Sequence, residues 1–251
     1  MNMISTTASA LPAQWDMQLT RETVGTLFGR QQLDLLAPVV RSVRVRLLHA
    51  LIHYTDYCKL FDLHFTNHIA DGFKPIELLF GGNGEDGVGA NNSFFIRAEA
   101  HVYAGLQALH AVADNMAHVV YYSLGWNLES KPSLASTGFY TIKERLINDA
   151  AVAPELRGLR DVFVILCGDG DFKALENATN HLKHHGGLPI EVGLNDDDGA
   201  PLIGKLKSFR RKLDLKPAEA VVNRLEQSQV VMNRFVVEAG CSLNEILMHR
   251  R

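Results

Sequence analysis

The sequence predicts an all-α protein, an antiparallel helical bundle with two long helices and one small β-hairpin insertion. Three observations carry this prediction. Apolar residues recur at helical spacing over two long stretches, about Gln31–Ile69 and about Phe94–Leu124. One segment, about residues 188–206, instead has two short apolar runs around the acidic turn Asn195–Gly199, which is typical of a hairpin. The other connections are short, and short connections favour antiparallel neighbouring helices.

The length and composition indicate a globular protein with its own core. The chain has 251 residues, of which 47% are hydrophobic and 21% charged, so it can bury most of the surface that it exposes when unfolded. We expect residues 1–17, which are rich in Ser, Thr and Ala, to form a flexible tail and residues 18–251 to form a single domain. The formal net charge of -3 gives no general attraction to nucleic acid or to an anionic membrane.

The cysteines and the N-terminal residues indicate the compartment. Three cysteines at wide spacing, Cys58, Cys167 and Cys241, argue against a disulfide framework and against a zinc site of the CxxC kind. The first residues lack the basic and apolar regions of a signal peptide, and no apolar stretch is long enough to span a bilayer. We therefore expect a cytoplasmic protein that does not enter the membrane.

Local signals predict where the helices begin and end. Pro38 marks a bend in the first long helix or its beginning, because proline suits a first turn and breaks a helix interior. The glycine-rich segment Gly81–Gly89 is expected to be a flexible connection, and Asn92-Ser93 to supply the N-cap of the second long helix. Shorter helices are expected at Phe139–Asn148, Ala153–Cys167, Phe172–His185 and Pro217–Met248.

Two of these shorter helices carry clear terminal signals. Asp169-Gly170-Asp171 is expected to cap the helix Phe172–His185, and Gly186-Gly187 is expected to end it. Pro217 is expected at the first helical position of the last helix.

Eleven histidines are more than a chain of this length usually has, and four of them lie on one face of the first long helix. They form two pairs at i, i+4 spacing, His49/His53 and His64/His68, and each pair could supply two ligands to zinc or iron. The pairs lie about 22 Å apart along the helix axis, so they cannot share one ion. The alternative is a polar helix edge with solvated or hydrogen-bonded histidines.

Two further histidine groups combine imidazoles with other polar side chains. His110, Asp114 and His118 follow each other at four-residue spacing, and a carboxylate beside an imidazole raises its basicity. The alternatives are a structural polar ladder at a helix interface and a metal site. Asn180, Lys183 and His184 share one helix face, where they could hold a phosphate or a ribose hydroxyl while the imidazole moves a proton. The alternative is a last helical turn whose cations complement the helix dipole.

A local basic run interrupts the mildly acidic sequence near residue 210. It is the best candidate for contacts to a phosphate backbone, although a solvated helix face is the alternative. Its members are Lys205, Lys207, Arg210, Arg211, Lys212 and Lys216.

The second and third histidine groups together resemble a known family. The segments FIRAEAHVYAGLQALHAVADNMAHVVYYSLG and ENATNHLKHHGGLPI are similar to the HEPN-like families of bacterial helical proteins, over about Phe94 to Ile190. In those families a long helix with a His-x3-Asp step precedes a helix that ends in an Asn-x-x-Lys-His-Arg-like run. The resemblance implies a helical bundle, dimerisation and a link to RNA or nucleotides, often in toxin–antitoxin or phage-defence systems.

The resemblance also has departures that bear on catalysis. His185 stands where the family's run usually has Arg. Active HEPN ribonucleases share an Arg-x4-6-His motif with a polar residue after the Arg, whereas Arg44-x4-His49 is followed by Val45. The sequence therefore leaves open whether this chain is a metal-independent endoribonuclease or an inactive relative.

The resemblance and the residue chemistry together give a specific hypothesis. We expect an RNA- or nucleotide-binding protein without a cofactor that forms a homodimer and has a small protein partner. His184, Asp114 and His110 are the expected catalytic residues, and the expected substrate-binding residues are Asn180, Lys183, Arg210 and Arg211. The alternatives are a metal-binding helical-bundle enzyme that uses the HxxxH pairs, and a non-enzymatic dimeric scaffold or antitoxin.

Overall fold

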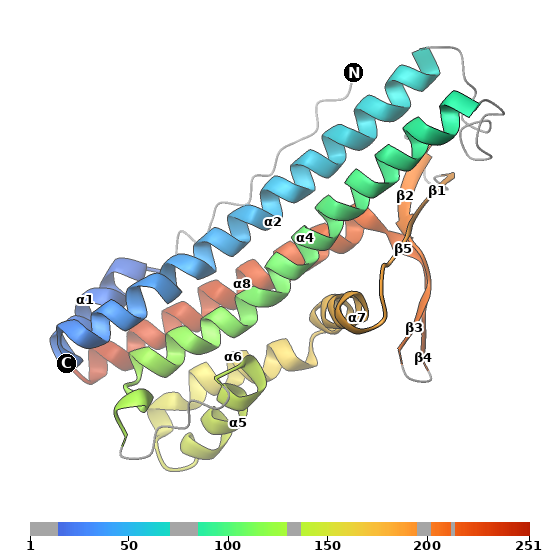
Figure 1. The fold of residues 1–251 in the computed structure, drawn as a ribbon. Helices are drawn as coiled ribbons and strands as arrows, with labels where there is room; N and C mark the ends of the chain where they lie inside the picture. The colour runs from blue at the N-terminus through green and yellow to red at the C-terminus, as the bar shows by residue number, and fades with distance from the viewer. Residues whose placement is uncertain (1–14, 71–84, 130–136, 195–201, 212–213) are drawn as a thin grey trace. The chain divides into compact units, whose positions relative to one another are not determined.

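A computed structural model describes residues 15–70, 85–129, 137–194, 202–211 and 214–251. The described chain is predominantly helical, as predicted, and carries a small amount of antiparallel β-structure (Figure 1). The α-helices are α1 (Met17–Phe28), α2 (Arg30–Ala70), α4 (Glu85–Ser123), α5 (Phe139–Asp149), α6 (Arg157–Gly168), α7 (Gly170–His184) and α8 (Val221–His249). Two short 3-10 helices are η1 (Trp126–Leu128) and η2 (Pro154–Leu156). The strands are β1 (Ile190–Leu194), β2 (Leu202–Leu206), β3 (Phe209–Arg211), β4 (Asp214–Lys216) and β5 (Glu219–Ala220).

The chain divides into two compact units. Unit 1 contains Met1–Val45, Val112–Cys167 and Met232–Arg251, and unit 2 contains Arg46–Ala111 and Gly168–Val231. All four crossings between the units fall inside helices rather than in linkers: three lie within α2, α4 and α8, and the fourth lies between the last two residues of α6. The expectation of a single domain over residues 18–251 stays a prediction.

Aromatic side chains form the centre of the core of unit 1. The rings of Phe139 on α5 and Phe163 on α6 are stacked with their centroids 5.3 Å apart. Phe235 on α8 packs edge-on against both rings, at 6.0 and 5.1 Å. All three side chains are buried, so the consecutive helices α5 and α6 share one apolar cluster with α8, which is distant in sequence.

The N-terminal end of unit 1 is held by a buried tryptophan. The Trp15 side chain is 3% exposed, and its indole N–H donates to the Thr20 hydroxyl at 2.9 Å. Asp16 caps α1 by accepting from the Leu19 N–H, and the Asn244 amide donates to the Asp16 carbonyl. Residues 15–17 of the expected tail therefore belong to the described part of unit 1, while residues 1–14 lie outside it, so the flexible tail stays a prediction.

The predicted hairpin is present in unit 2. Strands β1 and β2 pair antiparallel, with Ile190 opposite Leu206 and Leu194 opposite Leu202. The acidic turn lies outside the described residues. Residues 202, 204 and 206 of β2 are buried, and Gly204 lies against the buried Tyr57 of α2 so closely that a Cβ at this position would overlap the phenol oxygen. Glycine is therefore what lets this strand approach α2.

Several helix boundaries agree with the sequence signals. Helix α2 extends one residue further at each end than predicted, and α5 lies within one residue of its predicted range. The Asp169 carboxylate accepts from the Asp171 and Phe172 N–H groups at the start of α7, and Gly186 takes φ of +101° just beyond its end. These signals are local, so the sequence alone specifies them.

Other boundaries were predicted wrongly. Helix α4 begins at Glu85, so Asn92-Ser93 lies inside it and Gly81–Gly89 is helical from Glu85 onward. Glu219 and Ala220 pair with β2, so the last helix begins at Val221 and Pro217 is not its first residue. Pro38 lies in the interior of α2, so the helix does not begin there, and the alternative of a bend at Pro38 stays a prediction.

Four members of the basic run, Lys205, Arg210, Arg211 and Lys216, lie in strands, and none of its described members lies in a helix. A second hairpin, β3–β4, was not predicted, and it pairs Phe209 with Lys216 and Arg211 with Asp214. In these cases tertiary pairing of strands overrides the local preference.

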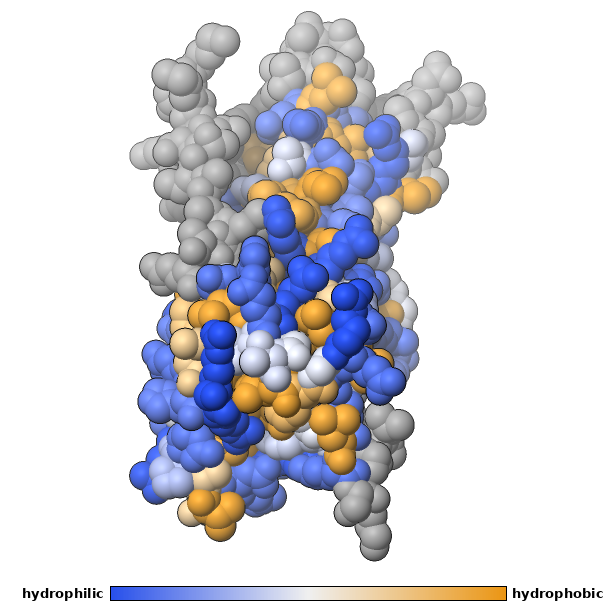
Figure 2. Space-filling model, turned by 90° about the vertical axis from the view of Figure 1, so that its left-hand side faces the viewer, coloured by the Kyte–Doolittle hydropathy of each residue, from blue (hydrophilic) through white to orange (hydrophobic). Residues whose placement is uncertain are grey.

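None of the helices in the described ranges is both long enough and apolar enough to cross a bilayer. The face in Figure 2 mixes hydrophilic and hydrophobic side chains. Exposed apolar residues are normal on the surface of a folded protein.

Candidate functional site

Asp114 and His118 have a structural role in unit 1. The Asp114 carboxylate accepts from the Phe139 N–H at 2.9 Å, and this group is one of the N–H groups at the start of α5 that lack a partner within the helix. The His118 Nδ1–H donates to the Asp114 carbonyl at 2.8 Å, and its Nε2 accepts from the Thr137 hydroxyl. The two side chains thus hold the segment that leads into α5, as in the structural polar ladder that the sequence allows.

The three expected catalytic residues do not belong to one unit. Asp114 belongs to unit 1, whereas His110 and His184 belong to unit 2. The His110 ring lies parallel to that of Phe172 of α7, with the centroids 6.4 Å apart. A catalytic site that combines the three residues stays a prediction.

We expect Asp114→Ala to lower the free energy of unfolding by about 0.5–2 kcal/mol, because α5 loses the acceptor at its N-terminus. Asp114→Asn keeps an oxygen acceptor and should lose less. Urea denaturation of both variants measures this difference. Equal stability of Asp114→Ala and the unmodified chain would contradict the capping role.

The end of α7 and the hairpin β3–β4 meet in unit 2. The rings of His181 on α7 and Phe209 on β3 have centroids 4.7 Å apart. One turn earlier on α7, the Asn177 side-chain oxygen accepts from the Arg211 guanidinium. Beside this contact lies an open pocket of about 190 Å³ lined by Asn177, Arg211, Asp214 and Lys216.

The end of α7 and the hairpin β3–β4 form a surface that we call the α7–β3 surface. Positively charged side chains outnumber acidic side chains on it. It comprises Asn177, Asn180, His181, Lys183, His184, His185, Phe209, Arg210, Arg211, Asp214 and Lys216. Arg210, Lys183, His184 and His185 are exposed, whereas Arg211 is half-buried. Asp214 is its one acid among the described residues, and it lies 3.9 Å from the Lys216 ammonium. A favourable potential for anions follows from this excess.

The structure brings only part of the predicted binding set into contact. Arg211 reaches α7, but its partner there is Asn177 rather than Asn180. No described residue forms a hydrogen bond or ion pair with the side chain of Asn180, Lys183 or His184, and the side chains of Lys183 and His184 are exposed to solvent. These three side chains are therefore available to a ligand and are not preorganised by the protein.

Sequence reasoning gave no role to Asn177, and it left His181, although within the third histidine group, out of the expected site residues. Burial, followed by the His185 imidazole, lowers the pKa of His181 from its ordinary value, so this ring is neutral at neutral pH. Its Nδ1 atom is buried and has no hydrogen-bond partner among the described residues. The i, i+4 spacing of the two residues is the only signal in the sequence that could have grouped them.

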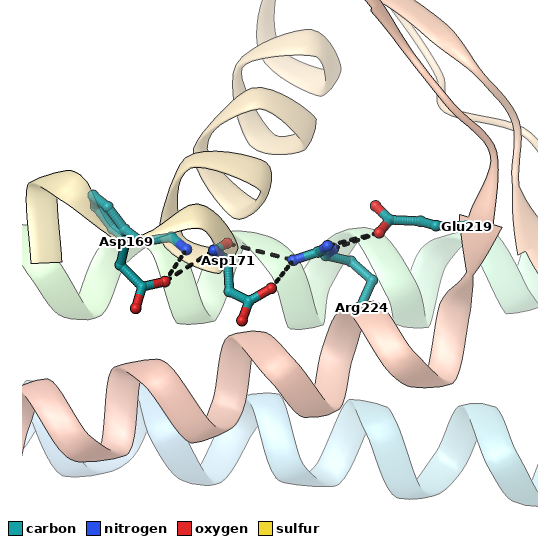
Figure 3. A network of polar contacts seen from close by, with 5 residues as sticks. Asp169, Asp171, Glu219 and Arg224 are labelled. Carbon is teal, nitrogen blue, oxygen red and sulfur yellow. Dashed lines mark hydrogen bonds and ion pairs between the residues drawn. The ribbon is translucent and has the colours of Figure 1, made fainter.

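A buried arginine fixes the beginning of α7 within unit 2 (Figure 3). The Arg224 side chain is 8% exposed and donates to the Glu219 carboxylate at 2.7 and 2.9 Å. It also lies 3.5 Å from the Asp171 carboxylate on the first turn of α7. This network ties α7, β5 and α8 together, and nothing in the local sequence of Arg224 predicted it.

The described histidines of the two α2 pairs have different surroundings. Nδ1 of His53 lies 3.3 Å from Nδ1 of His101 on α4, and His49 is exposed one turn before His53. His64 stacks on Phe94 at 4.2 Å, and the side chain of His68 lies outside the described part. Within the described part of the chain, no group of three or more His, Cys, Asp or Glu side chains is arranged to hold a metal ion.

We expect the stability of the protein to fall as the pH falls through about 6.5. Burial, and then the imidazoles of His101 and His49, lower the pKa of His53 below its ordinary value, while Asp56 opposes them. The unfolded chain therefore takes up a proton before the folded chain does, so the stabilising contribution is present above about pH 6.5 and lost below it.

Urea midpoints at about pH 7 and about pH 5 measure this loss. His53→Gln, which removes the titrating group, should show a smaller decrease between the two pH values. A decrease of the same size in His53→Gln and in the unmodified chain would contradict the assignment.

Comparisons with known proteins give no relative for this chain. No protein-family model, no curated protein and no solved structure matches it.

Proposed function

We propose that the protein binds single-stranded RNA at the α7–β3 surface of unit 2. The observation that carries this proposal is the contact between α7 and β3, which sets cationic, aromatic and histidine side chains beside one pocket. Cations neutralise backbone phosphates, and exposed rings stack on bases that are not paired in a helix. Single strands offer both phosphates and unpaired bases to such a surface.

Individual residues have distinct parts in this proposal. Arg210, Arg211 and Lys216 contact phosphates, since their charges are balanced only by Asp214 on the hairpin. The half-buried Phe209 ring provides a stacking platform. The overall charge of -3 is compatible with this role, because attraction to phosphates depends on the local potential within about 10 Å.

The proposal also includes the family properties that the sequence resemblance implies. We place the protein among HEPN-like helical bundles that form homodimers and have a small protein partner, with the helical content and the Asn180, Lys183 and His184 run as support. Cleavage of the bound RNA would rely on the exposed His184 for proton transfer.

Binding of a short labelled RNA to the full chain, followed by fluorescence anisotropy at several salt concentrations, tests the proposal. We expect saturable binding that weakens steeply as salt increases, with weaker competition from a nucleoside monophosphate than from unlabelled RNA. Absence of binding at low salt, or an affinity that does not depend on salt, would overturn it. Electrophoresis of the same RNA after incubation reports cleavage separately.

A further inference from the structure

In unit 2, two half-buried imidazoles from different helices face each other with ring nitrogens in contact. Nδ1 of His53 on α2 and Nδ1 of His101 on α4 are 3.3 Å apart, and the ring centroids are 5.5 Å apart. Gly105 lies one turn beyond His101, and a Cβ there would lie 3.6 Å from the Cβ of His53. This is an ordinary van der Waals distance, so α2 and α4 are in close contact at the level of the two rings.

The separation of the two nitrogens matches that of two ligands on one metal ion. Zinc binds imidazole nitrogen at about 2.0–2.1 Å with tetrahedral angles, which places two ligand nitrogens about 3.3–3.4 Å apart. The observed 3.3 Å falls in this range. An ion bound to both nitrogens would lie beside the line that joins them, so it requires a tilt of the two rings but no change in the distance between their Nδ1 atoms.

A third imidazole lies within reach on the solvent side. His49 precedes His53 by four residues, the i, i+4 spacing at which two histidines on a helix bind one zinc ion. Side chains on a helix lean toward its N-terminus, so the His53 ring leans toward the turn that carries His49. His49 is exposed, and a change of its rotamer costs little.

We propose that His53, His101 and His49 form a binding site for a zinc-like transition-metal ion. His53 and His101 are in place, and His49 joins them by rotation about its side-chain bonds. Water takes the fourth position, because the His49 side of the site is exposed. The site differs from the two HxxxH pairs that the sequence suggests, because its second helix contributes His101.

Isothermal titration of the full chain, purified without a polyhistidine tag, with Zn²⁺ near pH 7 tests this site. We expect one ion to bind per chain, and His53→Gln and His101→Gln each to weaken binding at least about 100-fold. His49→Gln should weaken it by about tenfold. The control His249→Gln changes an exposed histidine whose Nδ1–H donates to the Glu245 carbonyl, and it should bind as the unmodified chain does.

Two results would overturn the proposal. One is the absence of saturable Zn²⁺ binding by the unmodified chain, and the other is unchanged binding by both His53→Gln and His101→Gln. Circular dichroism checks that these variants fold. If they do not fold, the absorption spectrum of Co²⁺ bound to the unmodified chain tests the site instead. A spectrum typical of four-coordinate Co²⁺ supports the site, and one typical of six-coordinate Co²⁺ contradicts it.

Discussion

The double substitution Arg210→Glu and Arg211→Glu is expected to weaken binding of single-stranded RNA by about 10- to 100-fold at low salt. Both arginines lie on β3, where Arg210 is exposed and Arg211 borders the pocket. Each change replaces an attraction to phosphate by a repulsion. Loss of two phosphate contacts should also reduce the slope of the logarithm of the affinity against the logarithm of the salt concentration by about 1.4. Fluorescence anisotropy at several salt concentrations gives both values.

A matched control separates the local effect from the change in overall charge. Arg30→Glu with Arg41→Glu alters the net charge of the protein by the same amount on exposed positions of α2 in unit 1. This control should lose far less affinity. Similar losses in the two double variants would contradict a specific contribution of β3. Arg211→Gln, which keeps a donor for Asn177, checks that the hairpin stays folded.

Phe163→Ala should give the largest loss of stability, about 3–5 kcal/mol in the free energy of unfolding. The ring is fully buried, with 0% exposure, and contacts both Phe139 and Phe235. Its removal leaves a cavity between α5, α6 and α8 that rigid neighbouring rings fill poorly. Urea denaturation followed by circular dichroism measures the loss.

The adjacent residue provides the control for this prediction. Val164→Ala removes apolar atoms from a side chain that is 42% exposed, so its cost should stay below about 1 kcal/mol. A loss below about 1 kcal/mol for Phe163→Ala as well would contradict the central place of this ring in the core.

Features that depend on local sequence could be predicted. The Asp169 cap and Gly186 define the ends of α7 because each acts on backbone groups within a few residues. The hairpin of β1 and β2 follows from two apolar runs of matching length. The apolar stripe of α2 placed that helix to within one residue at each end, since a long periodic segment outweighs a single proline.

Features that depend on partners distant in sequence could not be predicted. β5 forms because Glu219 and Ala220 meet the free edge of β2, and no local signal reports that edge. The same is true of the site. Asn177 joins it through Arg211, 34 residues later, and Asp114 takes up a capping role because α5 begins beside it.

Photo-cross-linking of RNA that contains 4-thiouridine to the full chain tests the central claim most directly, because it locates the bound RNA. A protease that cleaves on the C-terminal side of glutamate yields the peptides 177–191 and 192–219, which together contain the whole α7–β3 surface. Mass spectrometry should find the cross-linked nucleotides mainly on these two peptides, at residues such as His181 and Phe209. Cross-links confined to peptides of unit 1 would contradict the proposed RNA-binding surface.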